Sequence, residues 1–391
     1  MIQEKEFFLR VLSDHLAGRE TVPVASLDWE RIVAYANAQQ LGGIVETQCR
    51  GFMPKDAMVC LKQKRNTAIY CYMKYQAALN EIGSAFRAAG ISFFVVKGLD
   101  VARYYPIPAL RTMGDCDIVV PHRQMRAAVA EMKRMGFTSE REDTAQQWGA
   151  SRHGLTIELH DALVQHGEFT NRRQRVFFNH FERYVHDGSL DRSFHFLFLL
   201  MHLRKHFLNY GAGFRQFMDL AVMIIKEPKL DWRWIEENLL ALQLRDFAHN
   251  CYALLERWFG ISAPVDYARP EKDFYEEITE QVFSGGVFGM DAENNLDNAA
   301  KTALAKARGP LWLRRLRRTM RDIFPSYQMM RGYAGCEYLY DRPYLLPAAW
   351  VHRIFMLFRK HRSNQARTGK QVSILDDEVV RRREWLNKMG L

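Results

Sequence analysis

The first part of the chain has the hydrophobic spacing of helices. Between residues 28 and 45, apolar side chains recur every three or four positions, and the carboxylate of Asp28 is suited to cap a first helical turn. A second stretch of the same kind covers residues 57–89 and stops at Gly90, a residue type that tolerates the left-handed conformation common after helices. The pattern predicts a mainly helical region over residues 1–89.

The pattern then changes to short apolar runs. Residues 91–96, 115–120 and 155–160 are rich in β-branched and aromatic side chains or alternate with polar ones, which is typical of buried strands. Residues 122–135 have helical spacing between the second and third of these runs. We therefore expect a small unit of strands and helices over residues 90–165.

Helical spacing returns afterwards. It predicts a helical domain over residues 166–300, and the longest helices are expected at 194–208, 215–225, 231–242 and 246–259. The region 301–391 contains amphipathic stretches separated by prolines, and its last residues, 376–391, form either a terminal helix or a frayed tail.

Composition limits the class of protein. The chain has 391 residues, 48% of them hydrophobic and 26% charged, which excludes a disordered or fibrous protein. Its six scattered cysteines show no paired spacing, so a disulfide framework or a structural zinc site is not expected and a reducing compartment fits best. There is no signal-peptide pattern and no apolar run near the ~20 residues of a membrane span. The expected location is cytoplasmic, either free or peripheral at the inner membrane surface.

Positive charge is concentrated near the end of the chain. Residues 301–370 carry 16 Lys or Arg against three acids, so this segment has a formal charge of +13 and the rest of the chain −3. Two stretches, residues 311–318 and 350–360, mix these cations with Trp, Leu and Phe. Such segments bind an anionic membrane surface, bind RNA, or pack on the body of the protein with their cations solvated, and the sequence leaves these alternatives open.

Two aspartates give the clearest chemical signal. Asp115 and Asp117 are two residues apart in a predicted strand, so their carboxylates would project from the same face. Two close carboxylates repel each other and invite a divalent cation, and Glu158 on another predicted strand is the best-placed third ligand. Magnesium prefers such oxygen ligands, and a pair of ions can activate an attacking oxygen and stabilise a leaving pyrophosphate. The alternative is that the aspartates only mark a strand edge that meets solvent.

Basic residues nearby could hold phosphate. Gly98 would let a polyphosphate approach the backbone, and Lys97 would add a point charge, although the pair could equally be a strand end with a solvated lysine. Arg111 could clamp a phosphate or pair with an aspartate.

Two pairs of residues four apart lie on the predicted helices. His202 and His206 share a helix face, but no HExxH glutamate lies between them, which favours a core or substrate-lining role. Arg215 and Asp219 are expected to form a pair on the helix surface, and the alternative is that Arg215 reaches a triphosphate.

Several motifs together resemble a known family. Val95-Val96-Lys97-Gly98, Tyr104-Tyr105-Pro106, Arg111 and the segment 114–120 resemble the uncharacterised bacterial nucleotidyltransferase family of the DNA-polymerase-β-like superfamily. Its third-carboxylate strand resembles residues 157–160, and its His-x-x-x-His and Arg-x-x-x-Asp segments resemble residues 202–219. Gly286–Gly289 and Phe324-Pro325 are similar as well, so the resemblance covers roughly residues 25–360. Cys116 stands where the family commonly has Ile.

The resemblance implies an α+β fold, with a small mixed β-sheet nucleotidyltransferase core flanked by helices and with helical N-terminal and C-terminal regions. It implies Mg²⁺-dependent (or Mn²⁺-dependent) transfer of a nucleoside monophosphate from an NTP to an acceptor hydroxyl, with release of pyrophosphate. The implied catalytic and metal-binding residues are Asp115, Asp117 and Glu158. The implied nucleotide-binding residues are Lys97, Gly98, Arg111, Gly114 and Arg215, and the implied substrate-lining residues are His160, His202, Lys205, His206 and Asp219.

The resemblance does not identify the acceptor, which could be a small molecule, a glycan, a peptide or a protein. Two alternatives of a different class remain open. One is a non-catalytic module of the same fold that binds a nucleotide or a partner. The other is a membrane-surface accessory protein of a biosynthetic cluster that acts through residues 301–370.

Overall fold

The computed structural model describes residues 2–139, 147–164, 171–186, 189–209, 211–286 and 376–391, together with parts of 301–363. Most of the glycine-rich stretch 286–289 and of the basic stretch 311–318 lies outside the described residues.

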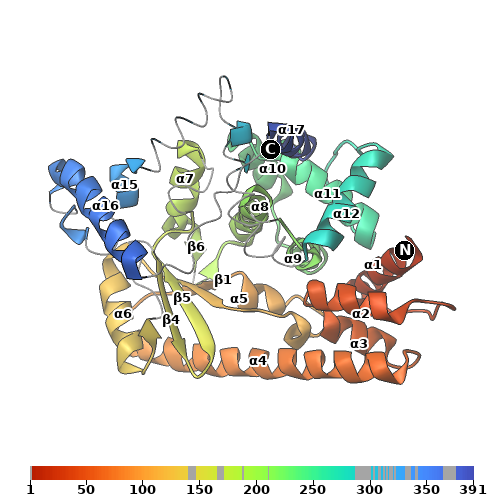
Figure 1. Ribbon diagram of the computed structural model, residues 1–391. Coiled ribbons are helices and arrows are strands. Elements are labelled where there is room, and N and C mark those ends of the chain that lie inside the picture. Colours follow the sequence, from red (N-terminus) through yellow and green to blue (C-terminus); the bar gives the residue numbers. More distant parts are fainter. Residues whose placement is uncertain are drawn as a thin grey trace.

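The N-terminal region, for which the hydrophobic spacing predicts mainly helix, consists of four helices. They are α1 (Ile2–Ala17), α2 (Trp29–Ala38), α3 (Gly42–Cys49) and α4 (Lys55–Ala88). Asp28 caps α2 by accepting a hydrogen bond from the backbone N–H of Arg31. The single helix expected over residues 28–45 is interrupted because Gln40 has a φ of +55°, which a right-handed helix cannot contain. Helix α4 runs beneath both the other N-terminal helices and the sheet (Figure 1).

A mixed sheet of five strands confirms the α+β fold class. The strands are β1 (Phe94–Val96), β2 (Cys116–Val119), β3 (Thr138–Ser139), β4 (Gln147–Arg152) and β5 (Leu155–His160), in the order β1-β2-β5-β4-β3. β2 and β5 are parallel and the other neighbours are antiparallel. The sequence pattern does not predict β3 and β4, because β3 is very short and the Gly-Ala-Ser centre of β4 is poor in strand-forming residues.

The two faces of the sheet have different partners, because successive side chains on a strand point to opposite sides. On one face, Cys116 and Ile118 of β2 and Ile157 and Leu159 of β5 are buried in a hydrophobic cluster with side chains of α4 and of α6 (Met125–Arg134). The other face carries the alternate residues of the same strands, which include the polar Asp117, Glu158 and His160 and the buried Val119. Helices α4 and α6 thus cover one face and leave the polar face for the helical domain.

The helical domain faces the polar side of the sheet. Its helices are α7 (Arg172–Asn179), α8 (Arg192–Asn209), α9 (Phe214–Lys226), α10 (Trp232–Ala241), α11 (Arg245–Phe259) and α12 (Lys272–Gly285), and short helix α5 (Gly98–Ala102) follows β1. A hairpin of β6 (Val185–His186) and β7 (Ser189–Leu190) and the 3-10 turns η1 (Pro108–Leu110), η2 (His122–Gln124) and η3 (Phe181–Tyr184) complete this part. The rings of Phe8, Phe214 and Phe283 are in mutual contact, so α1, α9 and α12 share one core. The division into four regions stays a prediction.

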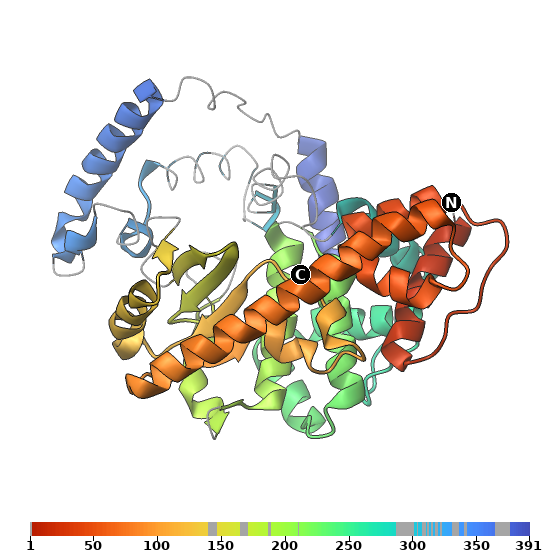
Figure 2. The same ribbon diagram turned by 90° about the horizontal axis from the view of Figure 1, so that it is seen from below.

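The C-terminal region has two separate parts. The elements α15 (Tyr327–Met330), η4 (Glu337–Leu339), η5 (Pro343–Leu345) and α16 (Leu346–Ser363) form a small hydrophobic cluster around Met330, Cys336, Leu339 and Ala349. Helix α16 lies at the edge of the molecule in both views (Figures 1 and 2). The last helix, α17 (Asp376–Lys388), packs into the main core through Trp385 and Leu386, and Met389 directly after it belongs to the same core. None of the helices that the structure describes is both long and apolar enough to cross a membrane.

Candidate active site

Strand pairing brings two of the candidate carboxylates together. In the parallel ladder of β2 and β5, Asp117 lies opposite Glu158, and on the other side of β2 it pairs with Val96. His160 is two residues beyond Glu158 and therefore projects from the same face of the sheet. The period of two that buries Ile157 and Leu159 on α4 and α6 thus directs Glu158 and His160 to the opposite side.

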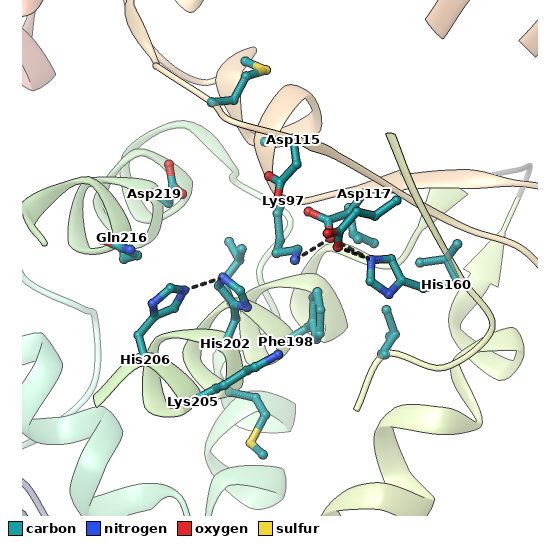
Figure 3. Close-up of a pocket in the computed structure, with 18 of the residues that line it drawn as sticks. Lys97, Asp115, Asp117, His160, Phe198, His202, Lys205, His206, Gln216 and Asp219 are labelled. Carbon is teal, nitrogen blue, oxygen red and sulfur yellow. Dashed lines mark hydrogen bonds and ion pairs between the residues drawn. The ribbon is translucent and has the colours of Figure 1, made fainter. Parts of the chain in front are cut away.

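Asp117, Glu158 and His160 form a group with the spacing of metal ligands. Their ligand atoms all lie within 4.8 Å of one another. His160 Nε2 is 2.8 Å from Asp117 Oδ1 and 3.3 Å from Glu158 Oε2, and Figure 3 shows the imidazole beside the Asp117 carboxylate. Two carboxylates and an imidazole suit Mg²⁺ through their oxygens and Mn²⁺ through either ligand type, so the residues fit a divalent ion.

Asp115 lies beside this group and is not part of it. The strand was expected to begin at Asp115, but β2 begins at Cys116, so Asp115 belongs to the preceding loop. Its side chain is exposed and borders the same pocket as Asp117. Partial desolvation, followed by the negative charge of Asp117, raises the pKa of the Asp115 carboxyl, which places the two acids within electrostatic reach of each other.

Lys97 is the cation closest to the acidic group. Its Nζ lies 2.8 Å from Asp117 Oδ1. Burial lowers the pKa of Lys97, but the charges of Asp117 and Asp115 outweigh burial and the pKa is raised overall. Burial likewise opposes ionisation of Asp117, yet Lys97 and His160 hold the pKa of Asp117 well below its usual range. An ion bound here would compete with both of these partners for the Asp117 oxygens.

The backbone at Lys97 is held in an unusual conformation. Its φ of +57° and ψ of −137° lie in a region that non-glycine residues rarely adopt. The backbone N–H of Lys97 donates to Nε2 of the fully buried His195 over 3.3 Å, and His195 Nδ1 lies 3.2 Å from Asp100 Oδ2. His195 on α8 therefore supports the turn that points Lys97 at Asp117. Sequence reasoning missed His195, although its spacing of seven from His202 places both on one helix face.

Arg111 forms a buried ion pair with a carboxylate. Its Nε and Nη2 lie 3.0 and 2.6 Å from the two oxygens of the buried Asp219, which also accepts a hydrogen bond from the Tyr105 hydroxyl at 2.8 Å. The expected surface pair of Arg215 and Asp219 is therefore wrong, because the Asp219 side chain is buried and binds Arg111 instead. Arg215 instead donates to the carbonyl of Thr112 at 2.9 Å.

Helix α8 forms the wall opposite the strands. Figure 3 shows Phe198, His202, Lys205 and His206 on this helix, facing Asp117 and His160. Nε2 of His202 and Nε2 of His206 are 3.0 Å apart. Burial, aided by the nearby charges of Lys97 and Lys205, lowers the pKa of His202 well below its usual value and that of His206 to about 3. Both imidazoles are therefore neutral at pH 7, and one Nε2–H donates to the other ring.

These walls enclose one pocket with a volume of about 350 Å³. All thirteen candidate residues from the sequence line it: Lys97, Gly98, Arg111, Gly114, Asp115, Asp117, Glu158, His160, His202, Lys205, His206, Arg215 and Asp219. The lining also includes apolar side chains, among them Val164, Phe198, Leu199 and Met201. The structure thus gathers the candidate residues, while their individual roles stay predictions.

One comparison with known proteins gives a match. The model of a family described as "uncharacterised nucleotidyltransferase" matches residues 25–260, a range that contains the whole pocket. Comparisons with curated proteins and with solved structures give no significant match for this chain.

Proposed function

Because the chain belongs to this uncharacterised nucleotidyltransferase family, we propose that it transfers a nucleoside monophosphate from an NTP to an acceptor hydroxyl and releases pyrophosphate. One observation carries the proposal. Asp117 and Glu158 lie side by side on parallel strands at the base of a pocket, directly beside the Lys97-Gly98 turn. Paired carboxylates next to a basic, glycine-containing turn suit a triphosphate with its counter-ion.

The acidic group would hold the divalent ion. Asp117 and Glu158 supply the oxygens, with Asp115 at the pocket wall and His160 as the neighbouring imidazole. When bound, Mg²⁺ or Mn²⁺ supplies a Lewis acid that offsets the charge of the phosphates. Glu158 also helps to deprotonate the acceptor hydroxyl, whose oxygen forms a bond to the α-phosphorus while the bond from this phosphorus to the pyrophosphate oxygen breaks.

The turn after β1 would orient the triphosphate. Gly98 lines the pocket at the start of α5 and has no Cβ, so a phosphate there would meet the backbone without an intervening side chain. Lys97, Gly114 and Arg215 border the same space. Arg111 acts differently from the expectation for a phosphate clamp. Its Nε and Nη2 donate to the two oxygens of Asp219 and its Nη1 donates to the carbonyl of Thr112, so it holds α9 and the loop before β2 in place.

The α8 wall would face the acceptor. His202, Lys205 and His206 lie across the pocket from the carboxylates, and the neutral histidine pair offers hydrogen bonds without a charge. The apolar lining from Phe198 and Met201 excludes water from the reacting groups. The identity of the acceptor stays open.

The test is labelling of acceptors with each α-labelled NTP in the presence of Mg²⁺ or Mn²⁺. The wild type should label an acceptor, whereas Asp117→Asn and Glu158→Gln should lose labelling by at least about a hundredfold. Asp273→Asn, at an exposed position on α12, is the control and should keep full activity. Equal labelling by the wild type and Asp117→Asn would reject the proposal.

The ion pair between Lys97 and Asp117 favours one alternative, a non-catalytic nucleotide-binding module. The ammonium already neutralises the carboxylate, so such a module would bind nucleotide without metal. Calorimetric titration with an NTP, with and without Mg²⁺, separates the two: affinity that depends on metal supports the transferase, and equal affinity supports the module.

A further inference from the structure

Helix α16 presents apolar side chains on two opposite sides. Its inner side packs Ala349 and Trp350 against the C-terminal cluster, and the Trp350 indole donates to the carbonyl of Pro325 at 2.7 Å. On its outer side, Val351 and Phe355 are 68% and 63% exposed. Large apolar side chains of a helix normally face a packed neighbour, and no described segment of the chain covers this outer side.

Exposed hydrophobic side chains concentrate in the same region. Of the sixteen large hydrophobic side chains that are exposed among the described residues, seven lie between positions 316 and 355: Leu316, Met320, Ile323, Phe324, Tyr344, Val351 and Phe355. The rings of Phe324 and Trp350 are in edge contact at 5.2 Å, so the first run of these residues meets α16. Scattered exposed hydrophobic residues need no explanation, but a concentration of this kind marks an interaction surface.

Charge identifies the kind of partner. Residues 342–375 contain seven Lys or Arg and no Asp or Glu. An apolar helix face within a purely cationic segment matches an anionic bilayer, in which apolar side chains enter the boundary of headgroups and acyl chains while cations meet phosphates. RNA would use the cations and could stack bases on Tyr344 and Phe355, but it would leave Val351 and the exposed Leu316, Met320 and Ile323 without a role. A second copy would bring the same positive charge into contact with itself.

We infer that Tyr344, Val351 and Phe355 are the docking face through which this protein attaches to an anionic phospholipid surface. The inference does not depend on the nucleotidyl-transfer reaction, because these residues lie outside the pocket. It makes the C-terminal region a peripheral anchor.

The experiment is flotation of the full-length protein with vesicles. We expect it to float with phosphatidylcholine vesicles that contain about a third phosphatidylglycerol, and not with phosphatidylcholine alone. The double variant Val351→Ser/Phe355→Ser should lower the apparent affinity by about tenfold, since two apolar side chains no longer enter the interface. The matched control is Val59→Ser/Met73→Ser on α4, where the side chains are 72% and 63% exposed, and it should float like the wild type.

Three results would overturn the inference. The first is no flotation with the anionic vesicles, and the second is equal flotation of the wild type and the α16 variant. The third is a change in the variant's oligomeric state or in its affinity for single-stranded RNA, with vesicle binding unchanged, which would assign the face to a second copy or to nucleic acid. Urea unfolding of both double variants shows whether they are folded, and labelling activity that persists in the α16 variant separates this test from that of the proposed reaction.

Discussion

Replacing Asp219 by Asn tests the assignment of Arg111 as a structural residue. The substitution keeps the shape of the side chain but removes its charge, so the guanidinium of Arg111 stays buried without a counter-charge; the two side chains are 8% and 7% exposed. The asparagine oxygen can still accept from Tyr105 or from Arg111 Nε, but its NH₂ group then faces Nη2 of Arg111, donor against donor.

The expected loss of unfolding free energy is about 3–5 kcal/mol, the range for breaking a buried ion pair on one side. This is a large part of the ~5–15 kcal/mol that typically separates folded from unfolded chains. In contrast, Arg111→Met combined with Asp219→Leu removes both charges and should recover most of the loss, because an apolar pair of similar volume leaves no charge unpaired. Urea unfolding followed by tryptophan fluorescence measures all three variants.

The chain contains a matched control for this prediction. Glu256 also binds an arginine with both oxygens, at 3.1 and 2.9 Å from Arg269, and accepts from a tyrosine, Tyr267. This group lies at the surface, with Arg269 70% exposed, so Glu256→Gln should cost less than about 1 kcal/mol. If Asp219→Asn unfolds at the urea concentration of the wild type but loses nucleotide binding, the structural assignment is refuted and Arg111 would instead be a phosphate ligand.

Three further predictions concern other parts of the molecule. His195→Leu should lower the free energy of unfolding in urea by about 1–3 kcal/mol and reduce labelling activity, because the backbone N–H of Lys97 loses its buried acceptor. Unchanged labelling activity would show that His195 does not support the Lys97 turn. Burial lowers the pKa of His15 to about 4, so the unfolded state binds more protons than the folded state between about pH 6.5 and 4. The free energy of unfolding therefore falls as the pH falls through this range, and the wild type should lose about 3 kcal/mol more than His15→Gln between pH 7 and 4. Parallel profiles of unfolding free energy against pH for the two proteins would contradict this. A Cβ at Gly390 would lie 2.8 Å from the backbone of α11, whereas a Cβ at Gly18, which has a similar positive φ, would meet nothing within 4 Å. Gly390→Ala should therefore lower the melting temperature clearly more than Gly18→Ala. Equal losses in melting temperature would show that backbone strain alone is responsible.

Local sequence patterns predicted which residues line the pocket better than they predicted how these residues pair. The period of two placed Glu158 on the polar face of its strand, and the D-x-D pattern led to Asp117. The predicted start of β2 was one residue too early, because β2 begins at Cys116 and Asp115 lies in the loop before it. The ends of a strand depend on hydrogen bonds to neighbouring strands, which the sequence of a single segment does not reveal.

Contacts distant in sequence could not be predicted in the same way. Arg111 and Asp219 are 108 positions apart, and the spacing of four between Arg215 and Asp219 suggested a local pair instead. Whether a helix residue faces a neighbour or solvent is decided by tertiary packing, and here α9 is buried along most of its length. The helical phase of α8 was readable, however, and it would have placed His195 on the same helix face as His202, although not its contact with Lys97.

Helix α8 connects the two sides of the pocket. Its N-terminal half supports the backbone of Lys97 through His195, and the next turns supply the wall that contains His202 and His206. A shift of this helix along its axis would therefore change the position of the Lys97 side chain and the shape of the opposite wall at the same time. Side-chain replacement in the turns that contain His202 and His206 would change the wall and leave the support of the lysine in place.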